Sequence, residues 1–368
     1  MSKARYIMIG GFLGAGKTTA VLRLAEHLSA KGQKVGLITN DQSVGLVDTA
    51  MLSNHGFDVQ EITGGCFCCR FNSLVDAADK LSADTQPDVF IAEPVGSCTD
   101  LKASVSYPLR RMYGDNFSIA PLSVLIDPIR AMRILGLEKG KAFSPKVLYV
   151  YNKQLEEAEQ IVINKIDLLT ADRLQQLRTA LTQRYPKASI HEISARVGTG
   201  LEGWFDSISR EQLGTDPTME IDYDIYADGE ALLGWVNATI WVSSSPAIDG
   251  NALVRRLADE IQRQLNADHA EIAHLKMTLS PDAPATDLAV LNIVRNDQSA
   301  EFSHKLAAPI ESGELLINLR AEADPDILKA AVISVLGGLS RDGLMLTVGH
   351  LESFRPGRPQ PTHRMAQA

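Results

Sequence analysis

Three of the chain's four cysteines lie within four residues, in the segment GGCFCC. Cys66, Cys68 and Cys69 could bring their sulfurs to one ion, and thiolates select soft or borderline metals such as Zn²⁺, Co²⁺ or Cu⁺ over Mg²⁺. Three protein ligands would leave one coordination position open for an exchanging partner, which suits a metal carrier. A buried turn with inert thiols and a redox switch between neighbouring thiols are the alternatives.

A glycine-rich segment near the N-terminus, GGFLGAGKTT, has the spacing of a phosphate-binding loop. It lies between a β-rich run and a helical pattern, which is the context such a loop requires. Glycines allow backbone angles that turn successive N–H groups toward phosphate oxygens. We expect Lys17 to reach the β- and γ-phosphates of a nucleotide and Thr18 to bind Mg²⁺. The expected nucleotide-binding residues of this segment are Gly11, Gly14, Ala15, Gly16, Lys17, Thr18 and Thr19.

A carboxylate at the end of a strand should complete the Mg²⁺ site, and two runs offer one. DVFIAEPVG contains Glu93, and LSVLIDP contains Asp127. Glu93 is better placed, because the N–H of the following Gly96 could meet a γ-phosphate, whereas Asp127 precedes a proline. We therefore expect Glu93 in the Mg²⁺ site and Asp127 as the cap of a turn. Cys98, just beyond Gly96, is expected to be a small buried side chain, with movement toward the other cysteines as the alternative.

The base of the nucleotide would be read by the segment NKID, which follows a hydrophobic run. An ionised Asp167 can accept hydrogen bonds from guanine N1 and N2, which adenine cannot donate. Lys165 would pack over the base plane, and Asn164 belongs to the same motif. Farther along, EISA places Ser194 and Ala195 at a strand end, where the Ala195 N–H could bond guanine O6. Together with the phosphate loop, this favours GTP over ATP.

Short apolar runs alternate with helical patterns from residue 5 to about 205, which predicts an α/β domain with a mostly parallel, doubly wound sheet, the P-loop NTPase architecture. Ligands of such sheets bind outside the carboxyl ends of the strands, where all the residues named above are expected. The segment after this domain is acidic and rich in turns. The later part reads as strands bunched between two helices, a smaller α+β domain. The expected boundaries are 1–212 for the P-loop domain, 213–229 for a linker, 230–352 for the C-terminal domain and 353–368 for a mobile tail.

The composition restricts the partners and the location. The 368 residues are 45% hydrophobic and 22% charged, and no apolar run approaches the roughly 20 residues that cross a bilayer. The N-terminus lacks the features of a signal peptide, so we expect a cytoplasmic protein that does not bind membranes. Thiols stay reduced in that compartment, which disfavours a structural disulfide. The net charge of −9 disfavours a nucleic-acid-binding protein.

With these segments in place, the sequence resembles the CobW-type GTPases, a family linked to cobalamin synthesis and to metal insertion or zinc homeostasis. The motifs GGFLGAGKTT, GGCFCC, EPVG and NKID carry the resemblance. It implies slow, Mg²⁺-dependent GTP hydrolysis coupled to holding and releasing a transition metal. Where that family typically reads N-E-F-G-E-x-G, this chain reads NDQSVGLVD, so Asp41 stands in place of a glutamate that contacts metal or nucleotide. The resemblance thus adds Asp41 as a metal ligand and, with Lys17 and Glu93, as a catalytic residue.

The sequence therefore predicts a GTP-driven metallochaperone that uses Mg²⁺ and carries Zn²⁺ or Co²⁺ at Cys66–Cys69. Its client would be a metalloprotein or a cobalamin-related enzyme, and a homodimer is possible. One alternative is a regulatory GTP switch that acts by protein contact, with structural or redox cysteines. The other is an activator that remodels a metal-dependent or cobalamin-dependent enzyme without carrying metal itself.

Overall fold

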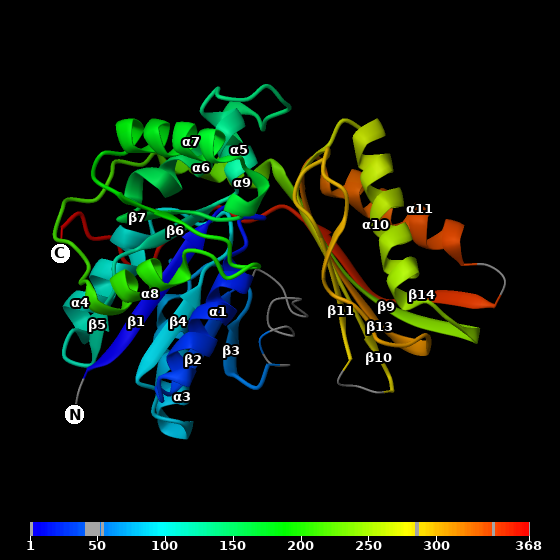
Figure 1. Ribbon diagram of the computed structural model, residues 1–368, viewed down its shortest axis with the longest axis horizontal. Coiled ribbons are helices and arrows are strands. Elements are labelled where there is room, and N and C mark those ends of the chain that lie inside the picture. Colours follow the sequence, from blue (N-terminus) through cyan, green and yellow to red (C-terminus); the bar gives the residue numbers. More distant parts are fainter. Residues whose placement is uncertain (1–2, 41–51, 53–54, 284–286, 341–342, 368) are drawn as a thin grey trace. The chain divides into compact units, whose positions relative to one another are not determined.

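The computed structural model describes residues 3–40, 52, 55–283, 287–340 and 343–367 (Figure 1). The described residues form two compact units. The first contains 3–40, 55–229 and 358–367, and the second is built mainly from 230–283, 287–340 and 343–357. The expected site residues that the structure describes all belong to the first unit.

The described strands of the first unit form one eight-stranded sheet, with the order β3-β2-β4-β1-β6-β7-β8 and with β5 also paired to β1. Every one of these pairings is parallel. The central strands are buried along nearly their whole length, as expected for a sheet covered on both faces. The strands are β1 (Ala4–Gly11), β2 (Val35–Asn40), β3 (Asp58–Ile62), β4 (Val89–Glu93), β5 (Phe117–Ile119), β6 (Ser123–Ile126), β7 (Gln160–Ile163) and β8 (Ser189–Glu192).

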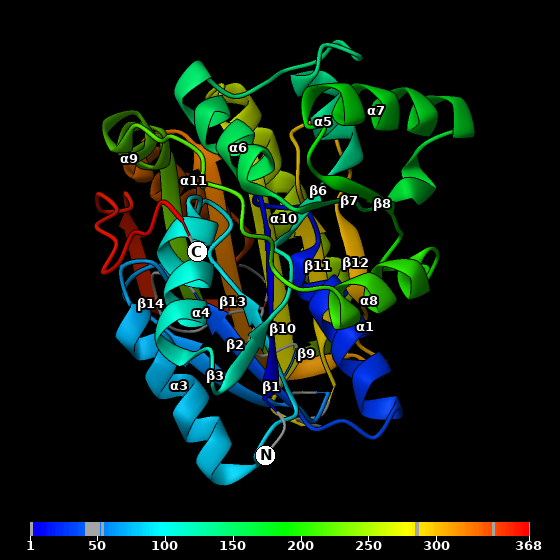
Figure 2. The ribbon, with the colours of Figure 1, turned by 90° about the vertical axis from the view of Figure 1, so that its left-hand side faces the viewer.

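Helices cover both faces of this sheet, with α1 and α8 on one side and α3, α4 and α6 on the other (Figure 2). Their buried residues recur at helical spacing, so each helix presents an apolar stripe to the strands. The α/β prediction is confirmed. The described helical elements are α1 (Lys17–Ala30), α3 (Phe71–Asp84), η1 (Lys102–Ser106), α4 (Tyr107–Tyr113), α5 (Pro128–Ile134), α6 (Pro145–Glu157), η2 (Ile166–Leu168), α7 (Ala171–Arg184), α8 (Leu201–Arg210) and α9 (Tyr223–Ala231).

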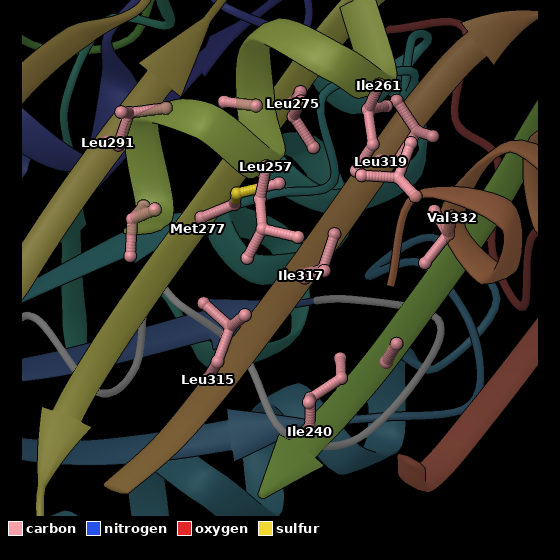
Figure 3. Close-up of a cluster of buried hydrophobic side chains, with 14 of the residues drawn as sticks. Ile240, Leu257, Ile261, Leu275, Met277, Leu291, Leu315, Ile317, Leu319 and Val332 are labelled. Atoms are coloured by element: carbon pink, nitrogen blue, oxygen red, sulfur yellow. The ribbon is translucent and has the colours of Figure 1, made fainter. Parts of the chain in front are cut away.

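The second unit is an antiparallel sheet packed against two helices, which confirms the α+β prediction. The strand order is β12-β11-β10-β13-β9-β14. Leu257 and Ile261 of one helix and Val332 of the other pack with Met277 and Ile317 of the sheet in a single core (Figure 3). The elements are β9 (Leu233–Ile248), α10 (Gly250–Ala267), β10 (Glu271–Pro281), β11 (Ala289–Ile293), β12 (Glu301–His304), β13 (Ile310–Glu322), α11 (Pro325–Leu339) and β14 (Leu344–Phe354).

Two of the expected boundaries fall inside elements of the structure, 229/230 within α9 and 352/353 within β14. The expected linker 213–229 runs into α9, whose Tyr226 is buried and accepts a hydrogen bond from the Thr99 N–H at 3.2 Å. The expected mobile tail 353–368 begins inside β14, which pairs with β9, and its residues 358–367 belong to the first unit. The Met365 N–H donates to the carbonyl of Ala103 in η1 at 2.9 Å, and both views show the segment 358–367 running beside α4 (Figures 1 and 2). Composition alone suggested mobility, but hydrogen bonds hold this segment in place.

Candidate nucleotide and metal site

The phosphate loop joins β1 to α1, and its conformation depends on glycine. Gly11, Gly14 and Gly16 have φ angles of +133°, +80° and +89°. A Cβ at Gly11 would lie 2.3 Å from the carbonyl oxygen of Leu125, and a Cβ at Gly16 would lie 2.5 Å from Asn164 Nδ2. The neighbouring strand and the NKID segment thus approach the loop too closely for a larger residue at either position.

Lys17, Thr18 and Thr19 form the first turn of α1, beside the end of β4. Lys17 Nζ donates to the Gly11 carbonyl at 3.0 Å, so the ammonium lies over the loop that would hold phosphates. Thr18 Oγ1 donates to Glu93 Oε1 at 3.1 Å, and both residues are buried. Hydroxyl and carboxylate oxygens are the hard donors that Mg²⁺ binds, usually with phosphate oxygens and waters. The pair Thr18 and Glu93 therefore fits a Mg²⁺ that accompanies a nucleotide.

The competing carboxylate, Asp127, has another role. Its Oδ1 accepts the Arg130 N–H at 2.9 Å and caps α5, as expected from the sequence. Its Oδ2 pairs with Lys165 Nζ at 2.9 Å. Asp127 therefore caps the N-terminus of α5 and holds the Lys165 side chain of the NKID segment in an ion pair.

Asn164 connects three loops. Its Nδ2 donates to the Ala15 carbonyl at 2.9 Å, and its Oδ1 accepts the N–H groups of Lys165 and Ala195 at 2.8 and 3.0 Å. Lys165 is in the left-handed conformation, with φ of +57°, and its Nζ donates to the Gly14 carbonyl at 2.6 Å. The NKID segment is therefore fixed to the phosphate loop at two points, although the two are about 150 residues apart in sequence.

Asp167 lies at the rim of this arrangement, with 24% of its side chain exposed. Its Oδ1 accepts the Ser194 hydroxyl at 2.5 Å, and its Oδ2 pairs with Arg196 at 3.2 Å. These donors hold the carboxylate in one orientation while leaving part of it open to a ligand. The Ala195 N–H donates to Asn164 in this structure, so a bond to guanine O6 would have to share or replace that contact.

Gly96 follows β4 and packs directly on the phosphate loop. A Cβ at this position would lie 2.7 Å from Leu13 Cδ2 and 3.1 Å from the Leu13 nitrogen. Gln154 of α6 donates its Nε2 to the carbonyl oxygens of both Gly96 and Cys98, at 2.9 and 2.8 Å. One buried amide therefore holds the segment that contains the expected γ-phosphate contact and the fourth cysteine.

The cysteine cluster follows β3, at the same carboxyl edge of the sheet as the phosphate loop. The sulfur of Cys66 lies 2.9 Å from that of Cys68 and 3.3 Å from that of Cys69, and the sulfurs of Cys68 and Cys69 are 3.6 Å apart. All three lie within 4.8 Å of one another, and none is in a disulfide. The thiols of Cys68 and Cys69 hydrogen-bond to Cys66 and lower its pKa, and the contact with Cys66 raises the pKa of Cys69 to about 11. The cluster therefore has the donor set and convergence of a thiolate metal site.

Asn40, the last residue of β2, holds the cysteine segment against the sheet. Its Nδ2 donates to the carbonyls of Ile62 and Gly65 at 3.0 and 2.7 Å, and its Oδ1 accepts the Phe67 N–H at 2.9 Å. Asp41, the next residue and an expected metal ligand, lies outside the described residues.

The C-terminal segment 358–367 crosses the cysteine cluster. The Gln360 N–H donates to the sulfur of Cys69 at 3.2 Å, and the Thr362 N–H donates to the Cys68 carbonyl at 2.8 Å. Arg364 Nε donates to the buried Asp100 carboxylate at 2.8 Å, just beyond Cys98. The segment therefore ties the loop that contains the cluster to the loop that follows β4.

The nucleotide-binding half of the chain matches a known family. The model described as "CobW/HypB/UreG, nucleotide-binding domain" matches residues 5–192, just over half of the 368 residues. The chain belongs to this family.

The curated relatives of this CobW/HypB/UreG protein are 30% identical to it or less, over about half of its length. "Zinc chaperone CobW" of Sinorhizobium sp is 27% identical over 219 residues, which cover 53% of this chain and 61% of the relative. "Zinc chaperone YeiR" of Escherichia coli (strain K12) is 30% identical over 172 residues, 46% of this chain and 49% of the relative. The chain thus spans about half to three fifths of the length of these curated relatives. The crystal structure of Zn(II)-bound YjiA GTPase from E. coli covers 91% of this chain and 99% of that one, at 15% identity and a TM-score of 0.37.

Sequence reasoning missed several residues that position the site in this CobW/HypB/UreG protein. Asn40 and Gln154 act through their amide side chains, and Arg364 comes from the far end of the chain. None of them belongs to a local motif. Only for Asn40 did the sequence give an indication, because Asn40 directly precedes the expected ligand Asp41 in the NDQSV segment.

No helix among the described residues has the length and apolar character to cross a membrane.

Glu157, at the end of α6, fixes the loop after Cys98 and should respond to pH. Its carboxylate is buried and accepts the Thr99 hydroxyl at 3.1 Å and the Lys102 N–H at 2.9 Å. Burial, with the nearby charge of Asp100, raises the pKa of Glu157 from 4.5 to about 8. Between these pH values the folded state keeps a proton that the unfolded state has lost, so the stabilisation present at low pH is lost as pH rises through about 8.

The substitution Glu157→Gln should therefore change how stability depends on pH. The free energy of unfolding of the variant should improve relative to wild type by roughly a few kcal/mol between pH 5 and pH 9. Chemical denaturation at pH 5, 7 and 9 measures this, with Glu156→Gln, at a more exposed position on the same helix, as the control. Parallel pH profiles for Glu157→Gln and wild type would show that Glu157 is ionised throughout.

Proposed function

We propose that this protein binds Mg²⁺ and GTP, hydrolyses GTP, and uses the nucleotide state to hold and release Zn²⁺ at Cys66, Cys68 and Cys69. The observation that carries the proposal is the convergence of three thiols within 4.8 Å at the edge of the sheet that also presents the phosphate loop. Zn²⁺ is preferred over Co²⁺ because the relatives described above are named zinc chaperones. The cargo would pass to a client metalloprotein, in a reducing cytoplasm that keeps the thiols free.

Each part of the nucleotide site supplies one step of this function. Lys17 and the N–H groups of the phosphate loop would bind and orient the phosphates, and Mg²⁺ on Thr18 and Glu93 would neutralise charge that develops during transfer. Asp167 would select guanine, and Gly96 would contact the γ-phosphate. Asp41 is proposed to orient the attacking water.

Packing contacts and hydrogen bonds connect the proposed nucleotide site with the cysteine cluster. Gly96 packs on the phosphate loop at Leu13, and the Gln154 amide donates to the carbonyls of both Gly96 and Cys98. Two residues farther on, Asp100 accepts from Arg364, and the segment that contains Arg364 also donates from the Gln360 N–H to the sulfur of Cys69. A displacement at Gly96 would therefore reach the thiol cluster through these contacts. Such coupling is reciprocal, so Zn²⁺ should also strengthen GTP binding.

Anaerobic calorimetry tests this coupling directly. We expect the Zn²⁺ affinity of the Mg²⁺-loaded protein to differ by about 5- to 150-fold between a non-hydrolysable GTP analogue and GDP. ATP analogues serve as the control and should leave the Zn²⁺ affinity at its nucleotide-free value. The same Zn²⁺ affinity with GTP analogue, GDP and no nucleotide would contradict the proposal and favour a GTP switch that acts by protein contact.

A further inference from the structure

The C-terminal segment 358–367 contacts the one cysteine of the cluster that is partly exposed, Cys69, whereas the other two are buried. The Gln360 N–H donates to the sulfur of Cys69 at 3.2 Å, and the Thr362 hydroxyl donates to the Cys69 carbonyl at 3.2 Å. A metal acceptor that approached the cluster from the surface would therefore meet Cys69 and this segment first.

The same segment is anchored beyond the cluster, on the loop that follows β4. Arg364 donates from Nε and Nη2 to the two carboxylate oxygens of Asp100, at 2.8 and 3.4 Å. Asp100 is 1% exposed, and its φ angle of +63° lies in the left-handed region that residues other than glycine rarely occupy. A buried carboxylate needs a charged partner or hydrogen bonds, and a strained backbone persists only where its surroundings fix it. The segment is therefore fastened to a buried, strained position in the loop that also contains Gly96.

We propose that residues 358–367 form a strap that closes the cysteine site, and that release of this strap opens Cys69 to a metal acceptor. This inference rests on the proposed function, because it assigns a gate to the same metal site. In the exchange step, a ligand atom of the acceptor would bond to Zn²⁺ as the bond to the Cys69 sulfur breaks, and the freed thiolate would take a proton from water. The strap would slow this step by covering the exposed ligand and by stabilising the negative charge on its sulfur.

The backbone N–H of Gln360 is the part of the strap that acts on the metal ligand. Hydrogen bonds to charged groups are stronger than neutral ones, and loss of an outer partner of a metal ligand typically costs 10–100-fold in affinity. The Gln360 side chain is exposed, and Pro359 and Pro361 bias the backbone toward the extended conformation that proline also adopts. Gln360→Pro therefore removes the N–H with little other change, and Gln360→Ala keeps it.

The anchor on Asp100 connects the strap with the proposed nucleotide site. Gly96, the expected γ-phosphate contact, lies four residues earlier in the same loop, and Gln154 donates to the carbonyls of Gly96 and Cys98. A rearrangement of this loop when the γ-phosphate is bound or lost would shift Asp100, and with it Arg364. The strap is therefore suited to open and close the metal site with the nucleotide state.

The rate at which Zn²⁺ leaves the full chain tests the strap. Anaerobically prepared protein with one Zn²⁺ bound is mixed with an excess of a chromogenic chelator in the absence of nucleotide. Gln360→Pro should release Zn²⁺ about 10–100-fold faster than wild type, and Gln360→Ala should keep the wild-type rate. Arg364→Ala leaves the N–H in place but removes the anchor, and it should release Zn²⁺ at least about tenfold faster. Arg358→Ala removes an exposed ion pair with Asp224 from the same segment, and it should behave as wild type.

Each outcome supports the strap or overturns it. Equal Zn²⁺ release rates in wild type, Gln360→Pro and Arg364→Ala overturn the strap while leaving the metal site intact. Release that is equally fast in the two control variants overturns it as well, because the rate would then follow any change in the segment. The two test variants weaken the strap at different points, so a folding defect in one leaves the other as the test. Wild-type protein that binds no stoichiometric Zn²⁺ overturns the proposed function itself, and the inference with it.

Discussion

The substitution Asp167→Asn should lower the affinity for GTP by about 10³-fold and raise the affinity for xanthosine triphosphate. The wild-type carboxylate would accept two hydrogen bonds, from guanine N1 and N2, and each charge-assisted bond contributes about 1.5–3 kcal/mol. An asparagine amide places N–H groups where guanine also has N–H groups. Xanthine has a carbonyl oxygen at that position, which the amide can bind. Ser194 and Arg196, which orient the carboxylate, remain in place.

Competition binding with GTP, ATP and xanthosine triphosphate measures this change in preference. Asp172→Asn makes the same charge change at an exposed position in the first turn of α7, and it should leave all three affinities unchanged. A thermal unfolding midpoint close to wild type separates loss of recognition from loss of the fold. If the ratio of GTP to xanthosine triphosphate affinity does not move, Asp167 does not read the base.

The residues of the proposed nucleotide site can be predicted from the sequence because each motif is a short run of residues that are neighbours along the chain. The glycines at 11, 14 and 16 need positive φ angles, and their spacing alone indicates a loop that turns N–H groups inward. The choice of Glu93 over Asp127 rested on what followed each acid. The structure pairs Glu93 with Thr18 and uses Asp127 as a helix cap.

The residues that hold the site together could not be found in the same way. Asn40 and Gln154 each bind backbone carbonyls of a distant loop, and a single amide in a sequence gives no indication of such contacts. Arg364 lies in a segment whose proline content is typical of disorder. Its order comes from tertiary contacts with Asp100 and with the cysteine loop, which local composition does not encode.

Cys66→Ala should have the largest effect on metal binding, because Cys66 is the residue that the other thiols share. Its sulfur lies 2.9 Å from that of Cys68 and 3.3 Å from that of Cys69. Loss of residues that only orient metal ligands costs about 10–100-fold in affinity, so loss of the central ligand should cost about 10³-fold or more. Chelator competition under anaerobic conditions measures this loss for Zn²⁺.

The nucleotide site provides the internal control for this prediction. Cys66→Ala should bind a GTP analogue with wild-type affinity when Zn²⁺ is absent, because Lys17, Thr18 and Asp167 bond to the Gly11 carbonyl, to Glu93 and to Ser194, all of which lie outside the cysteine loop. When Zn²⁺ is present, the wild-type protein should bind the analogue more tightly and the variant should not. Coupling between two binding sites is reciprocal, so removing the Zn²⁺ site also removes the effect of Zn²⁺ on nucleotide affinity. Ser106→Ala, a buried change in η1, should behave as wild type in every measurement. Tight Zn²⁺ binding by Cys66→Ala would show that the metal is held elsewhere, whereas a parallel loss of GTP affinity without Zn²⁺ would indicate damage to the fold.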